Sequence, residues 1–394
     1  MELREEAEHT TRKLDAEVEL DPQRQAKAET YARTRRMWML VELVVSLGLL
    51  LVFWLSGLSQ ALRDLWIDLG VSNPWALTAV YVLTLEIAGT LLFLPLGYWT
   101  GYVLPHRYDL STQTLAGWLK DQAKILGLEI LLGIPAIEVI YWLLRTQPNT
   151  WWMWGAGFMI LLNTILGALA PVLLVPIFYK LEPLEDEALV DRIKDLAQRT
   201  GTKVAEVKTI DLSSRTTAAN AMVMGLGSTK RIALGDTLYE DFSSDEIESV
   251  LAHELGHQIH HDLELGIAVQ TVLTIAGFYL VHVILRWSVH RFGFDSIADL
   301  AALPFVAMVG MLGSLAIGPL INAYSRWRER MADRFALDVI ESPTAFANAM
   351  IRLSNQNLAE ADPPEWVVWL LYDHPPIKER IEMARRYSTA RHQA

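Results

Sequence analysis

The chain has 394 residues, of which 52% are hydrophobic, and its formal net charge is −12. Such a sequence is too apolar for one soluble globular domain of this length. The acidic balance argues against nucleic acid as a partner, because a phosphate-binding surface needs a clustered excess of lysine and arginine. Since the chain contains no cysteine, disulfides and thiolate metal sites are excluded. Any metal must be held by His, Asp or Glu.

Residues 1–36 form a hydrophilic N-terminal segment that is rich in arginine and lysine. We expect a helical, solvated extension here, and the alternative is an arm that binds a partner. The first apolar run follows only after this segment, so the sequence does not indicate a cleavable signal peptide. We therefore expect the first apolar run to remain as a membrane anchor.

Six apolar stretches are each long enough to cross a bilayer as a helix, which takes about 20 residues. Each alone could be a buried helix of a large soluble domain, but six together favour a polytopic membrane protein. Several tryptophans lie near the ends of the stretches, where an amphipathic ring prefers the headgroup region. The stretches are residues 37–58, 75–103, 125–144, 151–179, 265–285 and 297–323.

Lysine and arginine are distributed unevenly among the short loops between these stretches. The N-terminal segment and the loop after the second stretch are rich in them, whereas the alternate loops hold few. Because loops rich in lysine and arginine tend to stay in the cytoplasm, we expect both termini to face the cytoplasm. The connection between the fourth and fifth spans is expected on the same side.

That connection, residues 181–264, predicts a small α/β domain. Ser243, with Glu246 three residues later, forms a capping box that predicts the start of a helix. Upstream of it we expect one helix and three strands, with "GLGST" as the turn between the last two strands. These elements are the helix 185–199 and the strands 204–212, 219–226 and 231–234.

The stretch "LAHELGHQIHH" places His253 and His257 four residues apart on one face of the predicted helix. Two imidazoles one turn apart can both reach a tetrahedral zinc ion. Glu254 would lie beside the metal, where a carboxylate can take a proton from a water that zinc has acidified. The alternative is a chance match in a chain with 10 histidines. His260 and His261 have no matching role, and we expect both at a solvated helix end.

A zinc ion held by two histidines needs a third protein ligand, and Glu329 in "SRWRERMADRFALDVI" is the best candidate. Asp333 lies one turn further on the same face, suited to orienting a ligating side chain. The alternative is that Glu329 pairs with Arg326 or Arg330 on an exposed helix. The position of Glu329 in the chain favours its role as a zinc ligand, because the two histidines precede the fifth span and Glu329 follows the sixth. Both groups then lie at helix ends on one membrane surface.

Two further blocks, one before and one after these two stretches, extend the pattern to four. The chain contains, in this order, "NAMVMGLGSTKRIALGDTL", "VLAHELGHQIHHD", "SRWRERMADRFA" and "DHPPIKERI". With these blocks it resembles the type I CAAX prenyl endoproteases, which are integral-membrane zinc metallopeptidases. The resemblance runs from about residue 41 to residue 387, and ordered agreement of this kind is far more specific than the histidine motif alone.

The resemblance implies a role for each residue that matches the zinc-binding blocks. His253, His257 and Glu329 match the family's ligands for one Zn²⁺ per chain. Glu254 matches its general base. Asp333 matches the acid that supports the ligands.

The resemblance also implies residues that contact the substrate. His374 in "DHPP" matches a histidine that steadies the tetrahedral intermediate, and Arg380 in "ERI" is its neighbour. Another set matches an edge strand on which the peptide lies, where backbone hydrogen bonds would bind substrates of varied sequence. This set is Asn220, Ala221, Met222, Val223 and Met224.

The implied function is hydrolysis of a peptide bond near the C-terminus of a peptide or protein substrate that carries a prenyl group. One alternative is a membrane-protein quality-control protease of broad specificity, as in the related HtpX group. A second alternative is a metal-stabilised membrane scaffold without turnover. Glu254 speaks against the scaffold, because a structural zinc needs no base. An arginine-rich, lysine-poor composition hints at a GC-rich bacterial genome and so at the bacterial inner membrane.

The expected fold is mainly α-helical: a polytopic membrane barrel or bundle of about six to seven spans, with a small α/β zinc-metallopeptidase domain on the cytoplasmic side. Eukaryotic members have seven spans, and the extra one precedes residues 37–58. Glu86, Glu129 and Glu138 lie inside apolar stretches, so we expect them to line an interior chamber or to face one another. The expected parts are residues 1–36, 37–180, 181–264, 265–323 and 324–394.

Overall fold

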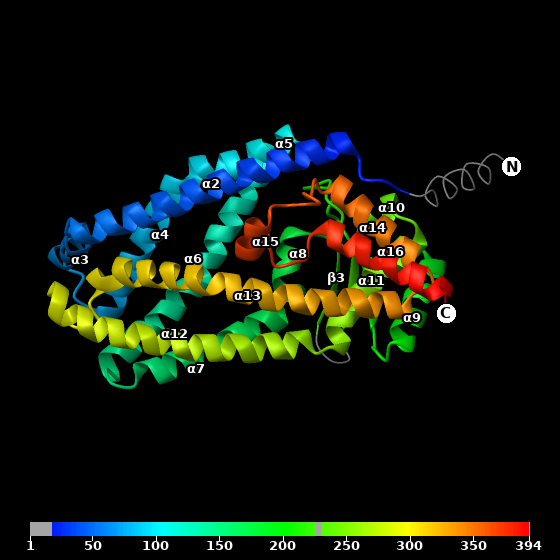
Figure 1. The fold of residues 1–394 in the computed structure, drawn as a ribbon. Helices are drawn as coiled ribbons and strands as arrows, with labels where there is room; N and C mark the ends of the chain where they lie inside the picture. Colours follow the sequence, from blue (N-terminus) through cyan, green and yellow to red (C-terminus); the bar gives the residue numbers. More distant parts are fainter. Residues whose placement is uncertain (1–17, 226–229, 394) are drawn as a thin grey trace.

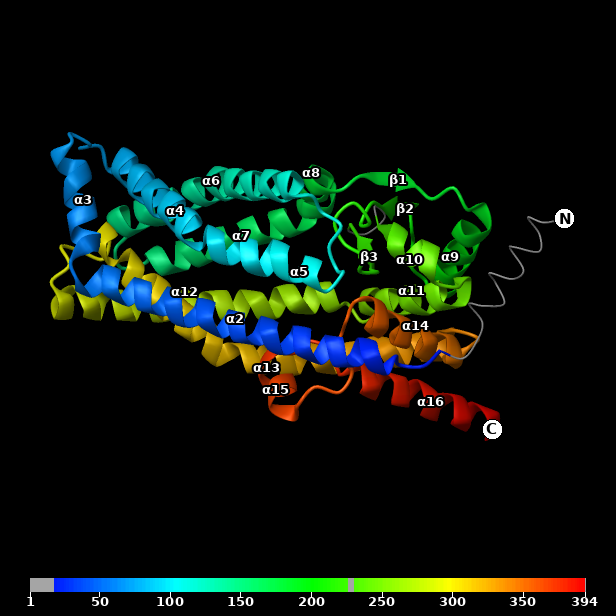
Figure 2. The same ribbon diagram turned by 90° about the horizontal axis from the view of Figure 1, so that it is seen from above.

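The computed structural model describes residues 18–225 and 230–393 of the chain. Long helices run side by side along most of the molecule, and a smaller part that contains a sheet lies at one end (Figure 1). The view from above shows the same two parts (Figure 2). The C-terminus and the start of the first long helix both lie at the end with the sheet (Figure 1).

The long helices confirm a mainly helical, membrane-spanning architecture. Among the described residues, five stretches are long and apolar enough to cross a membrane, and they overlap with the first, second, fourth, fifth and sixth expected spans. They are Pro22–Leu55, Pro74–Arg107, Trp151–Phe178, Asp262–Phe292 and Leu300–Val339.

Most of these stretches are composed of several helical elements. The first is α2 (Pro22–Leu55), followed by the short α3 (Leu58–Asp68). The second is α4 (Pro74–Tyr98), a π-helical turn at Trp99–Val103 and α5 (Leu104–Arg107). The others are α7 (Trp151–Leu169) with a π-helical turn at Ala170–Leu174 and α8 (Val175–Phe178), then α12 (Asp262–Phe292), and finally a 3-10 turn at Leu300–Ala302 with α13 (Leu303–Val339).

The expected third span lies within α6 (Leu115–Thr146), which is a continuous helix of 32 residues but is not among the five stretches that meet this standard. Glu129 and Glu138 interrupt its apolar sequence. The helix nevertheless packs against both α4 and α7 along the bundle (Figure 2). Five helices of the described chain, rather than the expected six, therefore meet that standard.

The three glutamates of the membrane part do not share one environment. Glu138 is buried, with a carboxylate oxygen 3.9 Å from a guanidinium nitrogen of Arg145. Arg145 lies on the same helix, α6, so this pair does not test whether Glu138 lines a chamber, and that stays a prediction. Glu86 and Glu129 face one another between α4 and α6. That these two carboxylates line a chamber stays a prediction.

The N-terminal segment is not a solvated extension over its described part, residues 18–36. Val18 and Leu20 pack against the core of the sheet-containing part. The amide of Gln25 donates to the hydroxyl of Ser354 at 3.0 Å, and its oxygen accepts from the backbone N–H of Ala361 at 3.1 Å. The expectation of a solvated segment is therefore wrong for these residues, and residues 1–17 lie outside the described part.

The sheet has four strands in the order β1-β2-β4-β3. Strand β2 (Glu206–Ile210) pairs parallel with β4 (Arg231–Gly235) and antiparallel with β1 (Leu181–Pro183), while β3 (Ala221–Met224) pairs antiparallel with β4. The sequence did not predict β1, since it is only three residues long and ends in a proline, which sheets tolerate at their edges. Residues 226–229 of the expected "GLGST" turn lie outside the described part.

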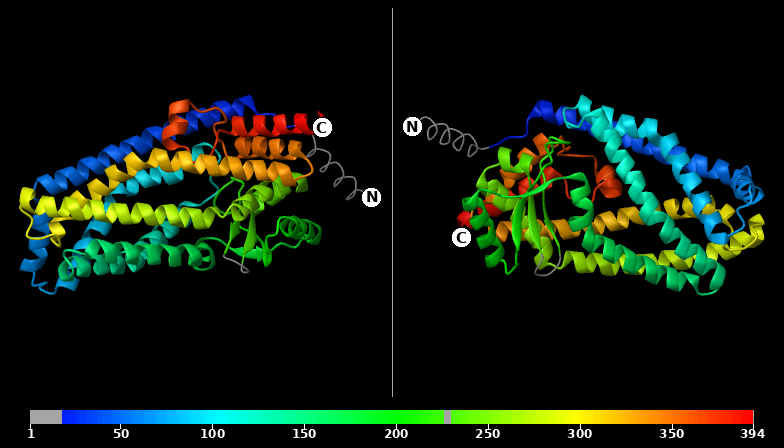
Figure 3. Two further views of the ribbon diagram at one scale, coloured as in Figure 1. Left: turned by 60° about the horizontal axis from the view of Figure 1, so that its bottom comes forward. Right: turned by 180° about the vertical axis from the view of Figure 1, so that it is seen from behind.

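Helix α11 (Ser244–Ile259) forms the centre of this part of the molecule (Figure 3). It begins at the expected capping box, in which the Ser243 hydroxyl accepts from the backbone N–H of Glu246 and the Glu246 carboxylate accepts from the backbone N–H of Ser243. It packs against the sheet and against α9 (Glu187–Arg199), α13 and α14 (Pro343–Gln356). The remaining helices are α10 (Asp236–Asp241), α15 (Glu365–Leu371) and α16 (Ile377–Gln393).

Candidate metal centre

The two histidines of the "HELGH" stretch converge with their outer ring nitrogens. His253 and His257 lie one turn apart on α11, and their Nε2 atoms are 3.2 Å apart. His253 is buried and His257 is half-buried. Two ring nitrogens aimed at one point favour a shared cation, because both can present lone pairs to it.

Helix α13 brings a carboxylate to the same point. Oε2 of Glu329 lies 3.2 Å from Nε2 of His253, and Oε1 lies 3.4 Å from Nε2 of His257. Glu329 is only 6% exposed, and its Oε2 atom is buried without a hydrogen bond of good geometry. A buried carboxylate oxygen in this state is suited to a metal ion. Together the three side chains offer one ligand atom each within 4.8 Å of one another.

A glycine allows α11 and α13 to approach this closely. A Cβ atom on Gly256 would lie 3.1 Å from Cα and 3.2 Å from the carbonyl oxygen of Ala332. Ala332 lies between Glu329 and Asp333 on α13. The backbone contact at Gly256 therefore fixes the distance between the histidine helix and the carboxylate helix.

Each histidine is oriented from its inner ring nitrogen by a further carboxylate. Nδ1 of His253 lies 2.8 Å from Oδ1 of Asp333, and Nδ1 of His257 lies 2.7 Å from Oδ2 of Asp262. When Nδ1 carries the proton, Nε2 is left with a lone pair for a metal. The sequence predicted Asp333 here but missed Asp262, whose only signal is its place five residues after His257.

Arginines hold these two carboxylates in turn. Arg380, which the resemblance placed near the substrate, is buried and donates from Nε to Oδ2 of Asp333 at 2.9 Å. Arg328 donates from Nε to Oδ1 of Asp262 at 2.6 Å. The contact between Arg328 and Asp262 could not be predicted from the sequence, because the two residues are 66 positions apart along the chain.

The electrostatics fit a cation at the centre. Burial lowers the pKa of the His253 imidazole, but the adjacent carboxylates of Asp333 and Glu329 outweigh burial and raise it to about 9. These carboxylates stabilise positive charge where the nitrogens meet. A metal ion that binds there would displace a proton and take over its place between the same groups.

Glu254 lies beside the three converging side chains without joining them. Its carboxylate has no hydrogen-bond partner among the described residues, and burial raises the pKa of this carboxyl group. A carboxylate with a raised pKa and no fixed partner can accept a proton and release it again. The arrangement suits a general base.

His374 approaches the centre from the loop between α15 and α16. Its Nε2 atom lies 3.4 Å from Oε2 of Glu329, and its Nδ1 atom lies 2.8 Å from Oδ1 of Asp373. The hydrogen bond to Asp373 raises the pKa of His374, which favours the charged imidazole. The side chain is 52% exposed, so it can reach a bound molecule.

The strand at the edge of the sheet lies next to α11. Residues 221–224 of β3 pair with β4 on one side, and no other described strand pairs with the opposite side. Asn220 precedes the strand, and its carbonyl oxygen accepts from the backbone N–H of Gly235 at 2.8 Å. Met222, Val223 and Met224 line a cavity of about 650 Å³ that also reaches α7 and α12. The free strand edge thus borders an open volume beside the histidine helix.

Comparison with known proteins agrees with this geometry. Residues 4–180 match the family model "CAAX prenyl protease N-terminal, five membrane helices", and residues 183–388 match "Peptidase family M48". The uncharacterized metalloprotease YhfN of Bacillus subtilis (strain 168) is 30% identical over 375 residues, which cover 94% of this chain and 88% of that protein.

Similarity to eukaryotic proteins covers nearly the whole chain. CAAX prenyl protease 1 of Saccharomyces cerevisiae is 28% identical over 393 residues, which cover 93% of this chain and 86% of that protein. The crystal structure of Ste24p from S. mikatae superposes with a TM-score of 0.85 at 25% identity, covering 94% of this chain and 90% of that one. The chain therefore belongs to peptidase family M48 and is a multi-pass membrane metalloendopeptidase of the CAAX prenyl protease type.

Proposed function

We propose that the chain is a zinc-dependent endopeptidase whose metal is held by His253, His257 and Glu329. The observation that carries this proposal is the convergence of two Nε2 atoms and one carboxylate from α11 and α13. Two imidazoles and one carboxylate are a donor set typical of catalytic zinc, which keeps a further position open. When bound, zinc supplies a Lewis acid and lowers the pKa of water to about 7.

The chain's own residues provide the proton transfers. Glu254 takes the proton of the attacking water and passes it to the amine that leaves. His374 donates a hydrogen bond to the substrate oxygen that becomes negatively charged during the attack. Asp333 and Asp262 keep the two imidazoles in the right tautomer and orientation. Arg380 acts through Asp333, which it holds by its guanidinium.

We further propose that the substrate peptide binds along the edge of β3. Backbone groups of residues 220–224 would pair with the peptide as an added strand, which gives affinity without strict sequence preference. The cavity beside β3 is lined mainly by apolar and small residues from α7 and α12. An extended peptide in this position lies next to α11 and the candidate metal centre.

Support for the substrate class comes from the relatives, several of which are named CAAX prenyl protease 1 or its homolog. We propose that the enzyme cleaves near the C-terminus of prenylated peptides. We also propose a bacterial inner membrane as its location, with the metal centre on the cytoplasmic side. The N-terminal segment is rich in arginine and lysine, and the connection from the second to the third expected span carries Arg107, Lys120 and Lys124.

A pair of matched peptides tests the proposal. The purified protein is incubated with a farnesylated peptide and with the same peptide unmodified, each with and without a zinc chelator. We expect chelator-sensitive cleavage near the C-terminus that is faster for the farnesylated peptide. Equal cleavage of both peptides would instead favour a protease of broad specificity, and cleavage that resists the chelator would contradict a zinc enzyme.

A further inference from the structure

The loop that carries His374 has little support from its own neighbours. Residues 372–376 connect α15 to α16, and the side chain of His374 is 52% exposed. Its hydrogen-bond partner Asp373 is 68% exposed. Two side chains that face solvent cannot hold each other at a fixed distance from Glu329, because exposed pairs contribute little order. The position of His374 must be set by other groups.

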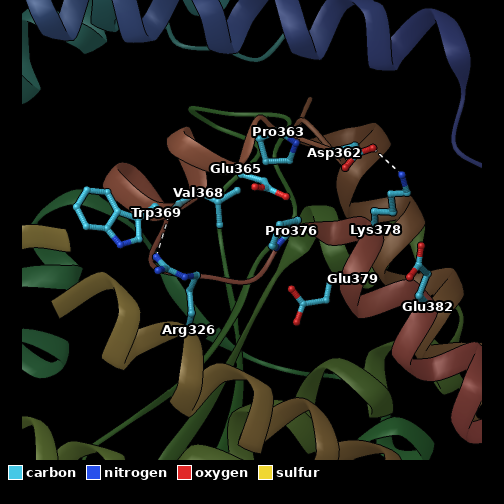
Figure 4. Close-up of a pocket in the computed structure, with 10 residues that line it drawn as sticks. All are labelled: Arg326, Asp362, Pro363, Glu365, Val368, Trp369, Pro376, Lys378, Glu379 and Glu382. Carbon is cyan, nitrogen blue, oxygen red and sulfur yellow. Dashed lines mark hydrogen bonds and ion pairs between the residues drawn. The ribbon is translucent and has the colours of Figure 1, made fainter. Parts of the chain in front are cut away.

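One such group is Arg326 on α13, three residues before Glu329. Its Nη1 atom donates to the carbonyl oxygens of Val368 at 2.9 Å and of Tyr372 at 2.5 Å. Arg326 is 7% exposed, and no carboxylate of the described residues lies within ion-pair distance of it. Figure 4 shows its guanidinium reaching from α13 towards α15, at the wall of a cavity of about 410 Å³.

The buried guanidinium of Arg326 is bound by two backbone carbonyl oxygens and by no carboxylate of the described residues. A charge taken out of water without an opposite charge is costly, and two backbone carbonyl groups compensate for it only in part. The two carbonyls belong to the last turn of α15 and to the residue two places before His374. The helix that carries Glu329 therefore also holds the backbone that carries His374.

A second group holds the side chain of the same tyrosine. The hydroxyl of Tyr372 lies 3.5 Å from Oε2 of Glu360, which is the atom that accepts from Nη1 of Arg36 at 2.6 Å. Glu360 is 8% exposed. Arg36 lies on α2, so the first membrane helix is linked to the loop through one buried carboxylate.

We propose that Arg326 and the Arg36–Glu360 pair are positioning residues that hold Tyr372 at its carbonyl oxygen and at its hydroxyl, and so keep His374 beside Glu329. This inference rests on the proposed function, in which His374 contacts the substrate during the attack. It adds a role for the two membrane helices α2 and α13, which set the geometry of the catalytic loop. Neither arginine contacts the reacting atoms.

A double-mutant cycle separates positioning from general stability. Arg326→Met is made in the wild-type protein and in His374→Ala, and kcat and KM are measured with a peptide that the wild-type protein cleaves. In the wild-type background we expect kcat to fall about 10- to 100-fold, as for a small misplacement of a catalytic group, with KM and zinc content changed less than about threefold. In the His374→Ala background we expect less than a twofold further loss, because the group that is positioned is gone.

The outcomes are distinct. Equal losses in both backgrounds, or an unchanged kcat for Arg326→Met in the wild-type background, would overturn the positioning role while leaving the proposed function intact. Wild-type kcat in His374→Ala alone would show that the proposed role of His374 is wrong, and the positioning role would fall with it. Arg326→Lys, which keeps a donor at this place, should recover part of the activity.

The link from Arg36 through Glu360 to the hydroxyl of Tyr372 is tested separately, without changing a residue of α13. Arg36→Met and Tyr372→Phe should each lower kcat about 3- to 10-fold at unchanged zinc content, which is a smaller loss because the carbonyl contact to Arg326 remains. Arg33→Met is the matched control, since Arg33 is an exposed arginine one turn earlier on α2 and has no partner among the described residues. It should keep the wild-type kcat. If Arg36→Met and Arg33→Met behave alike, the link through Glu360 is refuted.

Discussion

At the scale of single residues, each group at the centre is limited to one task by its partners. Carboxylates at Nδ1 leave the Nε2 atoms of His253 and His257 free, while Glu254 has no described hydrogen-bond partner at all. A general base must gain and lose a proton, which suits the unpartnered carboxylate of Glu254. The carboxylates of Asp333 and Asp262 are held by hydrogen bonds, which suits their task of keeping the imidazoles in place. This division argues for Glu254 as the base.

Glu254→Gln removes the base and keeps the size of the side chain. We expect kcat to fall about 100- to 10,000-fold, because an amide cannot accept the proton of the attacking water. Zinc content should remain at one ion per chain, since Glu254 is not among the converging ligand atoms. Steady-state kinetics and elemental analysis of the same preparation check both points. Near-normal turnover would remove Glu254 from the mechanism.

At the scale of elements, the centre depends on how closely α11 and α13 pack. Gly256 lies at the contact, where an added Cβ would meet backbone atoms of Ala332 at 3.1 and 3.2 Å. Backbone cannot move aside as a flexible side chain can, so the helices would have to separate. Because the histidines and Glu329 lie on opposite sides of this contact, separation would change the distances between the ligand atoms.

Gly256→Ala tests this packing. We expect a loss of about 1–3 kcal/mol in stability, which is typical of overpacking, together with weaker zinc binding. Gly277→Ala on α12 is the control, since nothing lies within 4 Å of its added Cβ. Thermal unfolding and a zinc titration are measured for both. A Gly256→Ala protein that binds zinc as tightly as the control would show that the helices tolerate the extra atom.

Elements that depend on local sequence patterns could be predicted. Contacts between segments far apart in the chain could not, because no local pattern encodes them. The Ser243–Glu246 capping box and the four-residue spacing of the histidines depend only on α11 itself. Strand β1 exists because β2 offers it an edge, and Asp262 reaches His257 because the chain turns at His261, where φ is +55°. No local sequence pattern predicts that β1 pairs with β2 or that Asp262 contacts His257.

At the scale of the whole molecule, the first membrane helix is tied to the catalytic part. The described start of the chain packs on the core of the sheet-containing part, and Gln25 is hydrogen-bonded on both sides of its amide. Composition alone suggested a solvated segment, because its charged residues outnumber the few apolar and amide side chains that make the contact. Docking of this segment therefore joins the first membrane helix to the sheet-containing part through contacts with residues 354–361.

Gln25→Ala should loosen this docking. It leaves the backbone N–H of Ala361 without its acceptor, which costs about 1–3 kcal/mol for a buried donor. Gln23→Ala, at an exposed position of the same helix, is the matched control and should change nothing. Thermal unfolding and hydrogen exchange of residues 354–361 are the measurements. Unchanged protection in Gln25→Ala would argue that the segment contributes nothing to the catalytic part.

The central claim is that two imidazoles of α11 and one carboxylate of α13 hold a single zinc ion. An anomalous difference map from crystals of the wild-type protein, with data on both sides of the zinc absorption edge, tests it most directly. We predict one peak per chain, about 2.0–2.2 Å from Nε2 of His253, Nε2 of His257 and a carboxylate oxygen of Glu329. A peak bound by other residues, or a zinc-loaded active protein without a peak between these three, would contradict the account.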